Sequence, residues 1–411
     1  MANVSSSNGL EKRPKLRFPG FDEPWEENEL SHYLVENTER NRGLAFGKGD
    51  VLSVSGEYGV INQITFQGRS FAGESVADYH IVETDDIVYT KSPLKANPYG
   101  IIKVNKGIPG IVSTLYAVYH PLNTVAPRFV DLYFANDLRL NKFLKPLVNI
   151  GAKHDMKVNN SFVLTGTVVF PSISEQQKLV DFFAKLDRRI EAQRKIVDAL
   201  KKYKRGVMQR IFRNMSAVSP SGFETVQLSA IFKKVSRRNN KSEIKNVITN
   251  SAEYGLIPQR DFFDKDIAVD GNTSNYYVIE QGDFVYNPRK SNTAPYGPFN
   301  RYEREERGII SPLYTCLVLQ ADIEPSYLAW YFKSDAWYRY IYDNGSQGVR
   351  HDRVSMTDGL LMGIPVIIPS KEAQLKIAKL LDCLESRFQT ELSQYESLKS
   401  IRVALLQQLF I

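Results

Sequence analysis

The chain repeats itself, with the second copy beginning about 198 residues after the first. Pro171 and Ser172 recur as Pro369 and Ser370. Three longer matches keep the offset between 196 and 198, namely residues 57–61 with 253–257, 86–89 with 283–286, and 151–155 with 348–352. This period is too long for a solenoid repeat. We therefore predict two related halves, an arrangement that suits a target which itself has two halves.

Composition is that of a globular protein, with 43% hydrophobic and 24% charged residues among 411. No apolar run approaches the roughly 20 residues that span a bilayer. The N-terminus lacks the apolar core of a signal peptide, so we expect a cytoplasmic protein without membrane contact. The two cysteines, Cys316 and Cys383, are too few for a disulfide framework or a zinc cluster. No bound metal is therefore expected.

The net charge of +7 is unevenly spread along the chain. Residues 174–213 carry 12 basic and 5 acidic side chains, whereas residues 20–171 and 223–369 are close to neutral. A basic excess is compatible with a nucleic-acid partner. The two large neutral segments can contact DNA only through local patches.

Two segments carry a heptad seam, in which apolar residues recur in alternating steps of four and three. Polar residues interrupt both seams at the same two places, Gln193 and Lys204 in the first and Glu391 and Arg402 in the second. The apolar seam residues are Leu179, Phe183, Leu186, Ile190, Val197 and Leu200, followed in the second copy by Ile377, Leu381, Leu384, Phe388, Leu398 and Leu405. An antiparallel pair of helices is expected, because a parallel pair would require the intervening domain to return the chain by roughly 58 Å.

The expected fold class is α+β, with two globular α+β domains separated by two long antiparallel coiled-coil helices and a pseudo-two-fold internal repeat. Ser172 and Glu175 predict a capping box at the first long helix, whereas Ala373 predicts a weaker cap at the second. A shorter helix is predicted over residues 325–342, with a counterpart near 126–142. The boundaries are an N-terminal arm 1–24, a first domain 25–171, a first long helix 172–213, a linker 214–222, a second domain 223–369 and a second long helix 370–411.

Motifs for catalysis are missing from the sequence. The glycines of residues 43–49 have the wrong spacing for a phosphate-binding loop. Asn97-Pro98-Tyr99 lacks the second proline of the motif with which adenine methyltransferases hold their base, and is interpreted as a loop turn. The five histidines lack metal-site spacing. Asp86, which recurs as Asp283, is interpreted as a strand-start cap rather than a nuclease carboxylate. No catalytic residue is therefore proposed.

Basic and hydroxyl residues in matching loops are candidates for contacts with phosphates and base edges, with an ordinary solvated loop as the alternative for each. The candidates are Lys91, Ser92, Lys153 and His154 in the first half, and Arg289, Lys290, Ser291, Arg350 and His351 in the second. The basic face of the first long helix is not repeated in the second, which argues against a symmetric DNA-binding role for it. An outer apolar stripe of Phe182, Ile196 and Tyr203 is either a docking strip or a domain contact.

Taken together, these features resemble the specificity (S) subunit of type I restriction-modification systems, over essentially the whole chain. The resemblance is carried by Leu-Arg-Phe-Pro-Gly-Phe at 16–21 before Trp25, by the two Asp-Ile/Phe-Val-Tyr strands, by Pro-Ser-Ile-Ser-Glu-Gln at the first long helix, and by the duplication itself. It implies a non-catalytic subunit whose two target recognition domains each read half of a split site in double-stranded DNA. The helices would set the spacing and dock two modification (M) subunits.

The resemblance also implies the chemistry of the partners. The M subunits would methylate adenine N6 with S-adenosylmethionine, and restriction (R) subunits would use ATP and Mg to cleave unmodified DNA in defence against foreign DNA. The chain itself would hold no cofactor. Two alternatives remain open. A self-sufficient DNA-modifying enzyme would be active alone, and a duplicated protein-interaction scaffold would not select a DNA sequence.

Overall fold

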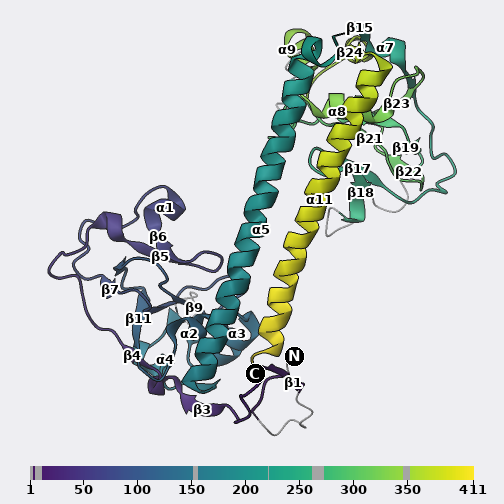
Figure 1. Cartoon of the computed structure of the whole chain (residues 1–411). Coiled ribbons are helices and arrows are strands. Elements are labelled where there is room, and N and C mark those ends of the chain that lie inside the picture. Colours follow the sequence, from purple (N-terminus) through teal and green to yellow (C-terminus); the bar gives the residue numbers. More distant parts are fainter. Residues whose placement is uncertain (1–2, 5–11, 151–155, 221, 262–272, 346–351) are drawn as a thin grey trace. The chain divides into compact units, whose positions relative to one another are not determined.

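The computed structural model describes all residues except 1–2, 5–11, 151–155, 221, 262–272 and 346–351 (Figure 1). It divides into two units, of which unit 1 comprises Met1–Gln193 and Gln394–Ile411 and unit 2 comprises Arg194–Ser393. Each unit combines a mixed α+β domain with a part of each of two long helices, α5 (Ile173–Arg213) and α11 (Lys371–Gln408). At 1.5 Å per residue, these helices are about 62 and about 57 Å long.

Unit 1 is built on a four-stranded antiparallel sheet in the order β4-β11-β8-β9. Its strands are β4 (Leu34–Glu36), β8 (Ile87–Thr90), β9 (Ile101–Val104) and β11 (Tyr116–Pro121). Two-stranded pairs surround it, namely β1 (Asn3–Val4) with β2 (Leu16–Arg17), β3 (Glu26–Glu29) with β14 (Thr167–Phe170), β5 (Leu52–Ser55) with β6 (Gly59–Asn62), β7 (His80–Val82) with β10 (Gly110–Val112), and β12 (Asn149–Ile150) with β13 (Met156–Lys157). The shorter helices are η1 (Leu30–His32), η2 (Lys48–Asp50), α1 (Gln63–Gln67), α2 (Pro127–Tyr133), α3 (Asp137–Leu144) and α4 (Asn160–Val163).

Unit 2 repeats this topology, with a four-stranded antiparallel sheet in the order β16-β23-β20-β21. Its strands are β16 (Phe232–Val235), β20 (Phe284–Tyr286), β21 (Phe299–Arg301) and β23 (Thr315–Leu319). The surrounding pairs are β15 (Phe223–Gln227) with β24 (Pro365–Pro369), β17 (Ile248–Ser251) with β18 (Gly255–Pro258), and β19 (Tyr277–Ile279) with β22 (Gly308–Ile310). The shorter helices are α6 (Met215–Val218), α7 (Leu228–Ile231), η3 (Gln259–Asp261), α8 (Pro325–Lys333), α9 (Tyr338–Asn344) and α10 (Asp358–Met362).

Within each unit the two long helices run antiparallel. In unit 1, Asp187 of α5 pairs with Arg402 of α11, and Phe183 lies one turn before Asp187 and contacts Phe410 near the end of the chain. In unit 2, Lys204 of α5 pairs with Glu385 of α11. The apolar seam residues predicted above are all buried or half-buried. The interruptions Lys204 and Arg402 are the two cations of these interhelical pairs.

A buried glutamine fastens the start of each long helix to its domain. The side-chain oxygen of Gln176 accepts a hydrogen bond from the amide of Ala126, and its NH2 donates to the carbonyl of Pro171, both at 2.9 Å. Gln374 makes the same two contacts, with Glu324 and Pro369, also at 2.9 Å. Both side chains are almost fully buried. The repeated sequence therefore encodes a repeated joint between helix and domain.

A phenylalanine at the far end of each long helix completes an aromatic core. Phe410 stacks on Phe129 with ring centroids 5.5 Å apart and meets Trp25 edge-on at 6.1 Å in unit 1. In unit 2, Phe212 contacts Tyr327 and Tyr331 at 5.7 and 5.6 Å. Each unit thus receives one helix start and one helix end.

Three local predictions were wrong. The helix predicted over 325–342 is two helices, α8 and α9, because Ser334 turns the backbone to an extended conformation (ψ 176°). Its counterpart is also broken, at Asn136, whose side chain caps α3. The capping box at Ser172 does not form. Glu175 instead accepts two hydrogen bonds from Arg17 of the N-terminal arm, whereas Ser370 does cap the second long helix through the amide of Ala373.

Candidate nucleic-acid interface

The loops that follow β8 and β20 share one backbone frame. In unit 1, Leu94 and Asn97 exchange two backbone hydrogen bonds, of 3.0 and 3.1 Å. In unit 2, Ser291 and Ala294 do the same, at 3.0 and 3.2 Å. The tyrosine before each loop closes it, since Tyr89 and Tyr286 donate their hydroxyl hydrogens to the carbonyls of Tyr99 and Tyr296 at 2.7 and 2.8 Å. The interpretation of residues 97–99 as a loop turn is confirmed.

A glycine at the end of each loop is required by close approach of the backbone. Gly100 and Gly297 have φ of +88° and +84°. A Cβ at either position would lie 2.0 Å from a backbone oxygen, that of Thr90 or of Asn287. Only glycine fits such a position without strain. The two loops are therefore rigid frames of the same shape on which different side chains are mounted.

This frame shows that the candidate cations of the two loops are not equivalent to one another. With Tyr89 matched to Tyr286, Ser92 corresponds to Arg289 and Lys91 to Pro288. Lys91 is half-buried, and its ammonium donates hydrogen bonds to the side-chain oxygen of Asn160 at 3.1 Å and the carbonyl of Thr114 at 3.4 Å. Burial lowers the pKa of Lys91. Lys91 is thus held by internal contacts, whereas Ser92 is exposed.

In unit 2 the loop carries an exposed cation, Arg289, and a half-buried one, Lys290. The side chain of Arg289 is 68% exposed, with Nε 3.7 Å from a carboxylate oxygen of Asp352. The amide of Lys290 donates to the carbonyl of Asp352 at 2.9 Å, and Arg289 pairs with Arg353 through a backbone bridge. The loop is therefore fastened by its backbone, which leaves the guanidinium of Arg289 accessible to a ligand.

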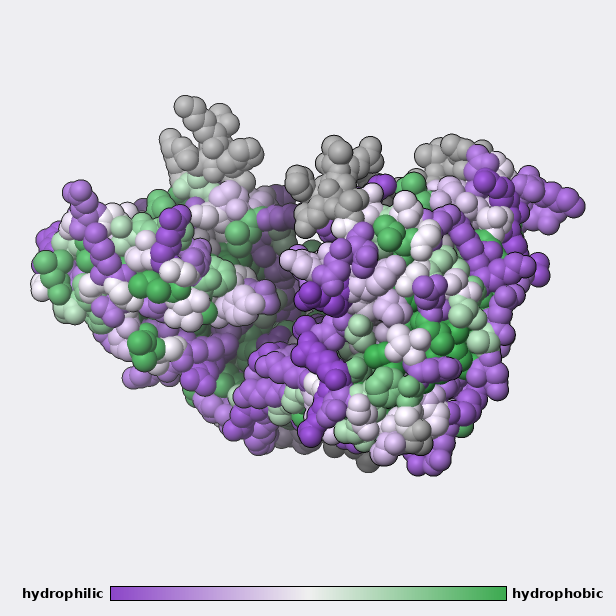
Figure 2. All heavy atoms as spheres, turned by 90° about the horizontal axis from the view of Figure 1, so that it is seen from above, coloured by the Kyte–Doolittle hydropathy of each residue, from purple (hydrophilic) through white to green (hydrophobic). Residues whose placement is uncertain are grey.

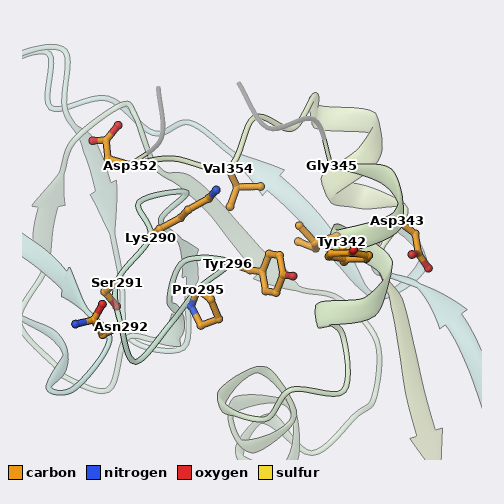
Figure 3. A pocket seen from close by; sticks show the side chains of 11 residues that line it. Lys290, Ser291, Asn292, Pro295, Tyr296, Tyr342, Asp343, Gly345, Asp352 and Val354 are labelled. Atoms are coloured by element: carbon orange, nitrogen blue, oxygen red, sulfur yellow. The ribbon is translucent and has the colours of Figure 1, made fainter. Parts of the chain in front are cut away.

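A cleft of about 880 Å³ opens beside this loop (Figure 3). Tyr296 and Tyr342 lie at its centre in the figure, with Lys290 and Val354 on one side. Ser291 and Asn292 line it from the loop, and Tyr342, whose side chain is 68% exposed, lines it from α9. Amide, hydroxyl, ammonium and aromatic groups in one cleft are the groups that read base edges and stack on bases. The remaining candidates, Lys153, His154, Arg350 and His351, lie outside the described residues.

The paired aspartates act as turn caps, as the sequence predicted. Asp86 accepts a hydrogen bond from the amide of Glu83 at 2.8 Å, and Asp283 accepts one from the amide of Glu280 at 2.9 Å. Burial raises the pKa of both carboxyl groups, against these hydrogen bonds. Each also contacts a cation or an imidazole, Arg237 for Asp283 and His120 Nδ1 for Asp86 at 2.5 Å. These carboxylates are occupied by structural contacts.

Sequence reasoning missed a second repeated contact, because the residue types at both of its positions differ between the units. In unit 1, the side-chain NH2 of Asn160 donates to the carboxylate of Glu36 at 3.0 Å. At the equivalent positions of unit 2, Lys234 donates to Asp358 at 2.5 Å. Each contact joins the edge strand of the main sheet to the short helix before the last strand. The signal in the sequence for this contact is the shared offset of 198 between Glu36 and Lys234 and between Asn160 and Asp358.

Within the described residues, no group of three or more His, Cys, Asp or Glu side chains is placed to hold a metal ion. The helices in the described ranges also include none long and apolar enough to cross a membrane. Figure 2 shows hydrophilic residues interspersed with small apolar patches on the face in view.

Comparison with solved structures identifies proteins of the same fold. A crystal structure of a type I restriction-modification system S subunit from M. genitalium matches with a TM-score of 0.53 and 15% identity, over 97% of this chain and 99% of that chain. This chain has the fold of a type I restriction-modification S subunit.

A second match has a TM-score of 0.51 and 14% identity, over 95% of this chain and 98% of the other. It comes from a structural study of complex assembly and conformational transition of the type I R-M system. No protein-family model matches the sequence. No curated protein matches it either. The S-subunit fold confirms the expected class, in which duplicated α+β domains accompany two long antiparallel helices.

Proposed function

We propose that this chain is the non-catalytic DNA-specificity subunit of a type I restriction-modification complex. One observation carries the proposal. The two units share sheet order, loop frames and helix joints, yet they mount different side chains on the matching loops. A duplicated scaffold with divergent loops suits a split DNA site whose two halves differ in sequence. The S-subunit fold over nearly the whole chain supports the same role.

The residues proposed to contact DNA belong to these loops. In unit 2, Arg289 contacts phosphate while Lys290 and Ser291, in the cleft with Asn292 and Tyr342, read the base edges. In unit 1, Ser92 is proposed at the position of Arg289. Lys153, His154, Arg350 and His351 complete the proposed contacts.

The long helices are proposed to set the distance between the half-sites and to dock two M subunits. Tyr203 of α5 and Ile401 of α11 occupy equivalent positions and are 60% and 49% exposed, and Ile196 of α5 is 42% exposed. Phe182 is different, because its ring packs on Phe18 of the N-terminal arm at 5.4 Å. Two separate docking surfaces are therefore proposed, one formed by Ile196 and Tyr203 in unit 2 and one around Ile401 in unit 1, and neither includes Phe182.

Catalysis is proposed to belong to the partners. The M subunits would bring S-adenosylmethionine and methylate adenine N6, and the R subunits would bring ATP and Mg and cleave unmodified DNA. Asp86 and Asp283 were considered as nuclease carboxylates. In the structure each accepts a hydrogen bond from a backbone amide and caps a turn.

The decisive experiment co-expresses the chain with the M subunit of a type I system from the same organism and maps N6-methyladenine in the host DNA by single-molecule sequencing. The expected result is one split, asymmetric motif with a fixed gap. Exchange of residues 25–171 for those of another S subunit should change one half of the motif only. A stable complex that methylates no motif would favour the protein scaffold, and methylation by the purified chain alone would favour a self-sufficient enzyme.

A further inference from the structure

A second pair of turns, between β10 and β11 and between β22 and β23, is repeated with its exposed apolar tip. Both turns read Ser-x-Leu-Tyr, at residues 113–116 and 311–314. Leu115 is 66% exposed and Leu313 is 61% exposed. A single exposed leucine on a surface is ordinary. Two at equivalent positions, within turns of the same construction, call for a common reason.

The two turns have the same hydrogen bonds at equivalent positions. The hydroxyl oxygen of Ser113 accepts from the amide of Leu115 at 3.4 Å, and that of Ser311 accepts from Leu313 at 3.3 Å. The next tyrosine amide donates to the same serine's carbonyl, at 3.1 Å for Tyr116 and 3.0 Å for Tyr314. Each leucine therefore stands on a hydrogen-bonded turn rather than on a loose loop.

The tyrosine after each leucine anchors the turn by packing on the hydrophobic core. Tyr116 packs on the cluster that contains Leu52 and Val118, and Tyr314 packs on the cluster that contains Ile248 and Cys316. Both rings are half-buried while the adjacent leucines are exposed. This anchoring fixes the direction in which the apolar tip projects.

These turns lie at the same end of the two central strands of each sheet as the proposed DNA-contacting loops. Tyr116 pairs with Thr90 at the end of β8, and the ammonium of Lys91 donates to the carbonyl of Thr114 inside the turn. In unit 2, Thr315 pairs with Tyr286 at the end of β20. Burial raises the pKa of Tyr314, and the positive charges of the nearby Arg289 and Arg353 act against that rise. An exposed leucine beside cations is thus present in both units.

We infer that Leu115 and Leu313 are apolar wedges that contact the bases of the DNA, one in each half-site. The inference rests on the proposed function. Leucine is among the side chains that DNA-binding proteins insert against base steps, where they unstack the bases and help to deform the duplex. Contact through an apolar tip carries little sequence preference, which explains why the tip is identical in two units whose other loop residues differ. In unit 2 the neighbouring Arg289 holds the phosphate backbone while Leu313 meets the bases.

The test uses the full chain in complex with its M subunit and compares Leu115→Ala and Leu313→Ala with wild type. Each variant should weaken DNA binding about tenfold, because burial of a leucine side chain is lost. The slope of log K against log salt should not change, since no phosphate contact is removed. A 2-aminopurine base placed next to the half-site should fluoresce less in the variant complex, as stacking is restored. Leu115→Met, which keeps an apolar tip, should retain most of the affinity.

Leu122→Ala serves as a control, because Leu122 is 39% exposed and follows β11 at the opposite end of that strand from Leu115. Leu115→Ala should act on substrates that carry the first half-site and Leu313→Ala on those that carry the second. Unchanged affinity and unchanged 2-aminopurine signal in both variants would overturn the inference while leaving the proposed function intact. Loss of the M subunit from the purified variant complex would also overturn it, by making the turn a protein contact. Failure of the wild-type complex to select any split site would instead count against the proposed function.

Discussion

The guanidinium of Arg402 donates to the carboxylate of Asp187 across the two long helices of unit 1, with Nε 2.5 Å from Oδ1. Lys204 and Glu385, each 198 residues away from its counterpart, form the same pair in unit 2. A polar break in a heptad seam costs stability but fixes the register of the helices. In each unit the cation that interrupts the seam pairs with a carboxylate on the facing helix, Arg402 with Asp187 and Lys204 with Glu385.

Arg402→Met should lower the free energy of unfolding by only about 0.5–1 kcal/mol, because the side chains of Arg402 and Asp187 are 29% and 44% exposed and their attraction is screened by solvent. Urea unfolding of the full chain followed by circular dichroism measures the change. In a double-mutant cycle with Asp187→Asn, a coupling energy near zero would show that the pair sets register without adding stability.

The pair of Arg17 and Glu175 should be much more sensitive. The side chains are 10% and 2% exposed, so Arg17→Met leaves a buried carboxylate without its partner. A loss of about 3–5 kcal/mol in unfolding free energy is expected. The double variant Arg17→Met with Glu175→Met should recover most of it, because no charge is then buried. A single variant as stable as wild type would contradict the role given to the N-terminal arm.

Gln374→Ala should cost about 1–3 kcal/mol, because the amide of Glu324 and the carbonyl of Pro369 lose their partners in a buried place. Gln176→Ala should behave alike in unit 1. Gln177 follows Gln176 in α5 and is exposed. Gln177→Ala is therefore the matched control and should leave the free energy of unfolding nearly unchanged. Urea unfolding of the three variants compares them directly.

Acid should destabilise the chain through His80. Burial, with the nearby cations Arg40 and Lys91, lowers the pKa of His80 to about 4 from its ordinary 6.5. Between these values the unfolded chain binds a proton that the folded chain does not. Stability should therefore be full above pH 6.5 and fall by up to about 3 kcal/mol as the pH drops to about 4. His80→Gln should remove this part of the pH dependence, as measured by urea unfolding at pH 7 and pH 4.5.

Arg289→Ala and Lys91→Ala should fail in different ways. Arg289 is exposed, so its loss should weaken DNA binding by the assembled complex and reduce the salt slope by about one, with unfolding unchanged. Lys91 is held by Asn160 and the carbonyl of Thr114, so its loss should lower the stability of unit 1. Isothermal titration with DNA and urea unfolding of both variants separate the two effects. Equal behaviour of the variants would contradict this division.

Repetition made the fold predictable. The heptad seams and the antiparallel helices follow from the spacing of the apolar residues in each segment. The turn caps at Asp86 and Asp283 follow from matching residues in the two copies, which make the same contacts. The capping box failed for a physical reason that a local pattern cannot contain. Arg17, 158 residues away, offers Glu175 a charged partner, which outweighs a local bond to a backbone amide.

The candidate site was harder to predict, because the loops of the two units differ in their side chains although the sheets and helices that carry them are alike. Lys91 and Arg289 looked alike as basic residues after a strand, yet one is tied inward and the other faces outward. Leu115 and Leu313 carry no charge, so their residue type alone does not predict a contact with DNA. Their exposure is a property of the turn, which only the three-dimensional structure displays.

Phe410 has a consequence for the order in which the protein forms during synthesis. Unit 2 is one continuous stretch, from Arg194 to Ser393, and can close its core as soon as that stretch has left the ribosome. Unit 1 cannot, because the ring that packs on Trp25 and Phe129 is made almost four hundred residues after Trp25. The domain that is translated first is therefore completed last, because Trp25 and Phe129 lack the ring of Phe410 until the second long helix has been made.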